Sequence, residues 1–299
     1  MFNEMINLGE KIKKTRLEKG LTQAELAEGI CTQASISNLE SNASVPSLPI
    51  LLSIGKRLNI DIAELSEYAI EQNNPAIAIF KQVQNLRSQF KLKEAHDLLK
   101  KEIHFEELKT NHEKKQYYYY LGITSLLGYN KISDATYNFN LGLQLEIEPH
   151  LEFLDILITN GIGLAYVMGS EDEKALTYFE KSLIELEEFM NSEVSFHDSI
   201  EIMKIYYTTA KFYSQIGEYN KALTLCDLGI SLQKNRHTNY ELDRLYYEKA
   251  FNLVQLGELV GAKEYYYHAG SLSKISGNEI LFKVIQKDMD TFDLGTIPY

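Results

Sequence analysis

Apolar residues in the first 60 positions recur at helical spacing in short segments separated by turn signals. Leu8 and Ile12 lie four residues apart and predict a first helix that ends at Gly20, a residue suited to a helix C-cap. Residues 22–25 read Thr-Gln-Ala-Glu, the form of a capping box, and predict the start of a second helix. The corner at residues 31–32 separates that helix from the next by very few positions.

A third helix follows the corner, with Ile36 and Leu39 on its inner face and polar residues on the other side. Residues 47–49 read Ser-Leu-Pro and predict a fourth helix, because proline is tolerated in a first helical turn. A second capping-box pattern opens a fifth, connecting helix over residues 61–72, and Asn-Asn-Pro at residues 73–75 interrupts it. The first 72 residues therefore predict a compact five-helix domain.

The rest of the chain, residues 75–299, carries an internal repeat. An alanine that follows a turn and precedes an apolar helix recurs at intervals of 40, 40, 47 and 40 residues, at Ala95, Ala135, Ala175, Ala222 and Ala262. A period of this size is typical of stacked helical hairpins, which need a small residue where two helices approach closely. We predict an all-α chain in which five hairpins wind into a right-handed superhelix, closed by a capping helix over residues 278–291.

Composition places the chain among ordinary globular proteins, with 44% apolar and 24% charged residues. Its two cysteines, Cys31 and Cys226, are far apart and fall in different predicted domains. We therefore expect no disulfide and a cytoplasmic protein without membrane association. Motifs for nucleotide binding, zinc hydrolysis or serine catalysis are absent, and none of the seven histidines has metal-ligand spacing. No enzyme activity, cofactor or metal is predicted.

The net charge of −12 needs to be divided between the two predicted domains. Residues 1–70 carry seven Lys/Arg and nine Asp/Glu, a net −2, whereas the remainder carries 23 and 33, a net −10. Five of the seven N-terminal cations lie within residues 11–19. Such a cluster suits phosphate binding, and a solvated helix face explains it equally well. Charge alone neither supports nor excludes DNA binding.

Residues 8–68 resemble the phage-repressor (lambda-repressor-like) type of helix-turn-helix domain, in which TQxxLA leads into a corner and then SxxxxE. The corner between Ile30 and Ile36 is one residue shorter than usual, and Cys31 stands where glycine is common. With Ile36 and Leu39 inside, the polar face of the third helix is left for the major groove, where glutamine and asparagine can pair with adenine. A purely solvent-facing role is the alternative for each residue. The predicted DNA-contacting set is Gln23, Thr32, Gln33, Ala34, Ser35, Ser37 and Asn38.

The repeat resembles the tetratricopeptide motif, with Gly163, Tyr166, Ala175 and Phe179 at its small and aromatic positions in the third hairpin. In such arrays the first helix of each hairpin lines the concave face, where aromatic rings, amides and cations suit an extended peptide. Packing within the array is the alternative role for each tyrosine. Asn160, beside two glycines, contributes little to packing by this reasoning. Tyr117 is a further inner position of the array, and the predicted peptide-contacting set is Gln84, Arg87, Tyr120, Thr124, Asn160, Leu164, Lys204, Tyr207, Lys211, Arg244, Tyr247 and Phe251.

Over nearly its full length, including the shortened corner, the chain is similar to the Rgg/NprR/PlcR/PrgX group of peptide-sensing regulators of Gram-positive bacteria. The resemblance implies a homodimer that binds double-stranded operator DNA, a short secreted signalling peptide taken back into the cytosol, and transcriptional activation. It also implies that residues 75–299 form the peptide-binding and dimerisation domain. Two reading helices would match a palindromic operator at a spacing of ~34 Å or a multiple of it. An array that docks a partner protein remains an alternative.

Overall fold

The structure, a computed structural model, describes residues 8–41, 43–60, 74–145, 151–191, 199–236 and 241–297. Contacts divide the chain into two units, Met1–Leu108 and Lys109–Tyr299, which we call the N-terminal and C-terminal units. All regular secondary structure in the described ranges is helical, which confirms the all-α prediction. The predicted connecting helix at residues 61–72 and the end of the first predicted domain lie outside the described residues.

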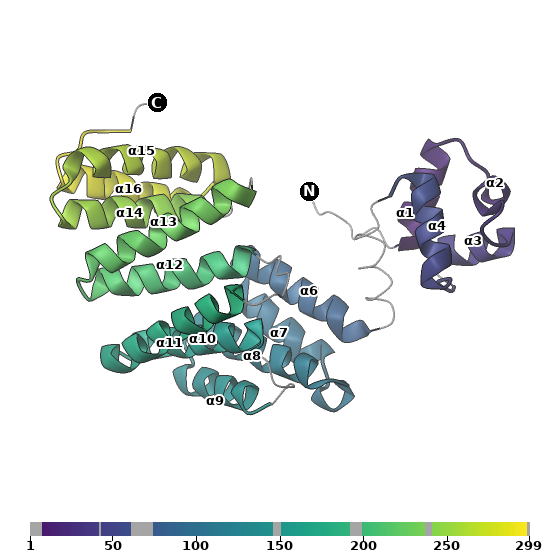
Figure 1. Cartoon of the computed structure of the whole chain (residues 1–299), viewed down its shortest axis with the longest axis horizontal. Coiled ribbons are helices and arrows are strands. Elements are labelled where there is room, and N and C mark those ends of the chain that lie inside the picture. Colours follow the sequence, from purple (N-terminus) through teal and green to yellow (C-terminus); the bar gives the residue numbers. More distant parts are fainter. Residues whose placement is uncertain are drawn as a thin grey trace. The chain divides into compact units, whose positions relative to one another are not determined.

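The helix-turn-helix domain consists of the first four helices of the N-terminal unit (Figure 1): α1 (Leu8–Glu18), α2 (Gln23–Ala27), α3 (Gln33–Glu40) and α4 (Leu48–Leu58). Their apolar faces meet in one core in which Leu26, Ile36 and Leu51 are fully buried. The i, i+4 spacing in the sequence is therefore the spacing of core residues. Four of the five predicted helices are present at their predicted places.

Local sequence determines where α2 begins and where the corner turns. Thr22 and Glu25 form the predicted capping box, in which the Thr22 side chain accepts from the amide of Glu25. At the other end of α2, Gly29 has a φ of +69°, a conformation that residues with a Cβ rarely adopt. The amide of Cys31 then donates to the carbonyl of Ala27 at 3.0 Å. The shortened corner is closed by these backbone hydrogen bonds.

From Pro75 onward, the helices that the structure describes pair in chain order into five hairpins and a cap, as the repeat predicts. The first hairpin, α6 (Pro75–Ser88) and α7 (Leu92–Glu102), lies in the N-terminal unit and is followed by the short 3-10 helix η1 (Phe105–Glu107). The C-terminal unit holds the others (Figure 1): α8 (Asn111–Tyr129) with α9 (Ile132–Leu143), α10 (Phe153–Met168) with α11 (Asp172–Met190), α12 (Ser199–Gln215) with α13 (Tyr219–Arg236), α14 (Leu242–Gln255) with α15 (Leu259–Ser276), and the cap α16 (Glu279–Thr291).

The repeated alanines lie in the interior of the array, and all five are completely buried: Ala95, Ala135, Ala175, Ala222 and Ala262. In the C-terminal unit the first helices of successive hairpins, α8, α10, α12 and α14, also contact one another in order. These helices therefore form one layer of the array. Among the described residues, no helix is both long and apolar enough to cross a membrane.

A glycine pair shows how tightly the second and third hairpins fit. The ring of Phe139, on α9, lies between Gly122 of α8 and Gly161 of α10. A Cβ atom added at Gly161 would lie 2.7 Å from the nearest Phe139 ring atom, and one added at Gly122 would lie 2.6 Å away. Contacts this short force the ring or the helices to move.

We therefore expect Gly161→Ala to destabilise the C-terminal unit by about 1–3 kcal/mol, because the added methyl group overpacks the Phe139 site. Urea unfolding of the full chain, followed by far-UV circular dichroism, measures the change. Gly169→Ala is the matched control, since the nearest atoms to its Cβ lie at 3.5 Å. Equal stability of the two variants would contradict this account of the packing.

Candidate nucleic-acid interface and ligand-binding surface

The corner and α3 carry all the predicted DNA-contacting residues except Gln23, which begins α2. Burial of Ile36 and Leu39 fixes the rotation of α3. Thr32 caps the helix by accepting from the amide of Ser35 at 3.2 Å. Within the predicted set, Thr32, Gln33, Ala34 and Asn38 are exposed, and Gln23, Ser35 and Ser37 are half-buried. Their contact with DNA stays a prediction.

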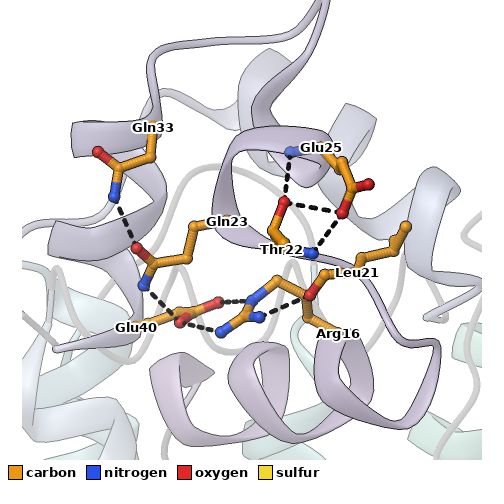
Figure 2. A network of polar contacts seen from close by, with 7 residues as sticks. All are labelled: Arg16, Leu21, Thr22, Gln23, Glu25, Gln33 and Glu40. Atoms are coloured by element: carbon orange, nitrogen blue, oxygen red, sulfur yellow. Dashed lines mark hydrogen bonds and ion pairs between the residues drawn. The ribbon is translucent and has the colours of Figure 1, made fainter.

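A chain of hydrogen bonds connects this surface to a buried ion pair (Figure 2). Gln33 Nε2 donates to Gln23 Oε1 at 2.7 Å, and Gln23 Nε2 donates to Glu40 Oε2 at 2.9 Å. Glu40 in turn accepts two hydrogen bonds from Arg16, at 2.5 and 2.8 Å. A third donor of Arg16 bonds the carbonyl of Leu21 at 2.7 Å. The orientations of both glutamine amides are therefore set from inside the domain.

Glu40 stays ionised despite its burial. Burial by itself raises the pKa of this carboxyl group, but the hydrogen bonds from Arg16 and Gln23 and the charges of Arg16 and Lys13 outweigh it, so the pKa lies below its usual value. The pKa of Arg16 is raised, chiefly by its hydrogen bond to Glu40. A charged, doubly hydrogen-bonded pair of this kind is geometrically well defined.

Two arginines of the domain serve its structure. Arg16 belongs to the cation cluster of residues 11–19, but it is buried against Glu40 and so is not available to a phosphate. Arg57, on α4, donates from one nitrogen to the carbonyls of Glu25, Leu26 and Glu28 at 3.3, 3.0 and 2.5 Å. It thereby satisfies carbonyl groups at the end of α2. The sequence prediction missed both roles, because each joins residues more than 20 positions apart.

The residues predicted to contact a peptide lie on the first helices of the hairpins. Gln84 and Arg87 lie on α6 in the N-terminal unit and are half-buried, while the rest lie in the C-terminal unit. Tyr120 and Thr124 are buried, and the Thr124 hydroxyl donates to the carbonyl of Tyr120 at 2.6 Å. Asn160 is buried as well, and the other members are half-buried or exposed: Tyr117, Leu164, Lys204, Tyr207, Lys211, Arg244, Tyr247 and Phe251. Their contact with a peptide stays a prediction.

Asn160 joins helices inside the array, so the expectation that it contributes little to packing is wrong, while its contact with a peptide stays a prediction. Its amide nitrogen donates to the hydroxyls of Ser182 at 3.1 Å and Thr209 at 3.2 Å. Its amide oxygen accepts from Thr208 at 2.8 Å. These bonds join α10 to both α11 and α12, so the buried amide holds the third hairpin to the fourth.

Other side chains on this layer are paired within a helix or between hairpins. Within α12, Lys204 Nζ lies 2.7 Å from Glu201 Oε1. The guanidinium of Arg244, on α14, lies 5.9 Å from the ring centre of Tyr207, on α12. Lys211, one turn further along α12, is exposed. Among the described residues, no group of three or more His, Cys, Asp and Glu could hold a metal ion.

Comparison with known proteins agrees with the two-part architecture. Residues 12–65 match the Helix-turn-helix family, a type of domain that binds DNA in transcriptional regulators. Comparison of the sequence with curated proteins finds no match.

Three solved structures share the fold over nearly the whole chain. PlcR of Bacillus thuringiensis, solved with the peptide PapR7 and DNA, is 23% identical with a TM-score of 0.64, covering 94% of this chain and 99% of its own. ComR of S. thermophilus, solved with DNA and its signalling peptide ComS, is 16% identical with a TM-score of 0.52, covering 96% and 100%. The SHP pheromone receptor Rgg2 of Streptococcus dysgalactiae is 13% identical with a TM-score of 0.54, covering 95% and 99%. The chain thus consists of a helix-turn-helix domain followed by a helical-repeat array, the fold of PlcR, ComR and Rgg2.

Proposed function

We propose that the protein is a cytoplasmic transcriptional regulator that binds operator DNA through α3 as a homodimer, under the control of a short signalling peptide held by the repeat array. The observation that carries the DNA-binding part is the hydrogen-bond chain from Gln33 to Arg16, which fixes the amide of Gln33 on the exposed face of α3 and that of Gln23 at the start of α2. The match of residues 12–65 to the Helix-turn-helix family supports the same conclusion.

The amide geometry favours adenine as the base that Gln33 reads. A bidentate pair with adenine needs an amide oxygen that accepts from N6 and an amide N–H that donates to N7. Gln33 uses one of its two N–H groups to bond Gln23. Its second N–H and its oxygen remain for the base, so Gln33 can bond Gln23 and an adenine at the same time.

We expect Gln33→Ala to weaken binding to the preferred operator by about 5- to 150-fold, since a good bidentate pair contributes about 1–3 kcal/mol of base discrimination. Sites selected from random double-stranded DNA by the wild-type chain and by the variant provide the measurement. The variant should lose the preference for adenine at one position of each half-site and keep its helical content, because the Gln33 side chain is exposed. An unchanged preference would exclude Gln33 as a reading residue.

The array supports control by a ligand. PlcR and ComR, which share the fold, were solved in complex with a peptide. A peptide that binds one arrangement of the dimer more tightly than another would shift the population toward it, and so change the spacing of the two reading helices.

Ile275 and Ile280, at 79% and 81% exposure near the α15–α16 junction, are apolar residues that a second copy of the chain could cover. We infer activation as the regulatory outcome.

Recovery of DNA fragments tests the proposal as a whole. Purified full-length protein is incubated with fragmented genomic DNA, with and without synthetic peptides derived from small secreted reading frames. Recovery of a palindromic site that depends on one peptide supports peptide control. Recovery that no peptide changes, together with no peptide binding, would favour the alternative in which the array docks a partner protein. Failure to recover any specific site would overturn the DNA-binding proposal.

A further inference from the structure

One position of the repeat differs chemically in the fifth hairpin. Four residues after each repeated alanine, the second helix of a hairpin places a side chain in the core, and at Leu99, Phe139, Phe179 and Cys226 it is apolar or a thiol and fully or almost fully buried. The fifth hairpin has Tyr266 at this position, with no exposed surface. The repeat therefore places a phenolic hydroxyl where the other hairpins have none.

Tyr266 packs against a second tyrosine, which is hydrogen-bonded to a carboxylate. The rings of Tyr266, on α15, and Tyr247, on α14, meet edge to face with centres 6.1 Å apart. Tyr247 donates its hydroxyl proton to Asp288 Oδ2, on α16, at 2.9 Å. The three residues come from the last hairpin and the cap, which lie together at the C-terminal end of the array (Figure 1).

This cluster holds unused hydrogen-bonding capacity. The buried Tyr266 hydroxyl has no hydrogen-bond partner among the described residues. Buried polar groups without partners are uncommon in folded proteins, and their presence points to a bound water, ion or ligand. Asp288 is only half-buried, so the cluster reaches the surface through it. Burial, reinforced by the charge of Asp288, raises the pKa of both tyrosines, so both hydroxyls remain protonated and neutral at physiological pH.

The donors and acceptors of the cluster suit a primary ammonium group. Such a group has a positive charge and three N–H donors but no acceptor. Asp288 supplies the opposite charge and an oxygen that Tyr247 does not use, and each phenolic oxygen retains acceptor capacity. These three oxygens match the three ammonium donors in number, whereas a guanidinium carries five donors in a fixed plane.

We propose that Tyr247, Tyr266 and Asp288 form a subsite for a primary ammonium group, either the free amino terminus or a lysine side chain, of the peptide that the array binds. This subsite rests on the proposed peptide-binding function and gives it a chemical preference. It also predicts an orientation, since the part of the peptide that carries the ammonium group lies at the capped end of the array.

Three pools of randomised heptapeptides test the preference with the full-length protein. The first pool has free amino termini and no lysine, the second has acetylated termini and no lysine, and the third has acetylated termini and one lysine. Peptides retained after gel filtration are counted by mass spectrometry. We expect the first or the third pool to be retained about tenfold better than the second, which corresponds to one charge-assisted hydrogen-bonded contact. Whichever pool is retained identifies the source of the ammonium group.

Variants then assign the preference to the cluster. Asp288→Asn should remove it and Tyr266→Phe should weaken it, while Asp290→Asn, an exposed change on the same helix, should leave it intact. Equal retention of all pools by the wild type, or a preference that survives Asp288→Asn, would overturn the subsite and leave peptide binding standing. A Tyr266→Phe chain that is more stable and retains peptides as before would show that the hydroxyl serves only a resident water. Retention of no pool would overturn the peptide-binding proposal together with the subsite.

Discussion

Glu40→Gln is expected to destabilise the helix-turn-helix domain by about 3 kcal/mol, because it leaves the buried charge of Arg16 without its partner. A single core of this size rarely supplies more than about 3–5 kcal/mol in total, so the loss removes most of the domain's stability. Operator affinity should fall with it. Limited proteolysis of the full-length chain, read by the appearance of cuts between residues 8 and 60, measures the unfolding directly.

Two control variants distinguish the effect of losing the Arg16–Glu40 ion pair from the effect of removing a negative charge. Glu18→Gln makes the same chemical change at an exposed position of α1 and should not alter the proteolysis pattern. The double change Arg16→Met with Glu40→Leu replaces the pair by apolar groups and should restore a folded domain. Because Gln23 then lacks its acceptor, DNA binding should remain weakened in the refolded variant. A Glu40→Gln domain that resists proteolysis like the wild type would contradict the structural role of the pair.

Protonation of Glu40 is expected to lower the stability of the helix-turn-helix domain at acid pH. The folded state holds the pKa of Glu40 below its ordinary value of 4.5, so the ionised form is favoured by folding. The stability that this group contributes is present above its unfolded pKa and is lost as the pH falls through the lower, folded pKa. Resistance to proteolysis should therefore decline below about pH 4.5, and this particular decline should be absent from the folded double variant.

The parts of the fold that the sequence predicts correctly depend on local sequence signals. The capping box at Thr22, the proline near the start of α4 and the repeated alanines each act through neighbours a few residues away or through a fixed period, and each has its predicted role in the structure. The cap was likewise predicted at residues 278–291 and is observed at Glu279–Thr291. These features depend on backbone geometry and burial alone, which residue type and spacing largely determine.

The polar chemistry of the sites was less predictable, because it depends on contacts between distant residues. The hydrogen bond of Gln23 to Glu40 spans 17 positions, and that of Tyr247 to Asp288 spans 41. Sequence placed Gln23, Gln33 and Tyr247 in candidate sets from their helix faces but could not supply their partners. The SxxxxE pattern, which ends in Glu40, was the one available signal for the buried pair.

The role of Asn160 could not be predicted without knowing its neighbours in space. Its substitution is the second change from which we expect a large loss of stability. Asn160→Ala should destabilise the C-terminal unit by about 2–3 kcal/mol, since it removes three hydrogen bonds and leaves the buried Ser182 and Thr209 hydroxyls without this partner. Urea unfolding of the peptide-free chain measures the loss. Asn140→Ala, at an exposed position of α9, is the matched control and should change stability little.

Measuring the stability of the peptide-free protein distinguishes two roles of the Asn160 amide, contact with a ligand and contact between hairpins. If Asn160 serves only to contact a ligand, its removal should leave the stability of the free protein unchanged and reduce peptide affinity. If it joins the third hairpin to the fourth, the free protein itself should be weakened, and amide exchange should accelerate in both α10 and α12. The second outcome has a consequence for regulation: a peptide that drew the Asn160 amide away from Thr208 and Thr209 would loosen the contact between two hairpins, and so change the array at the point where it binds.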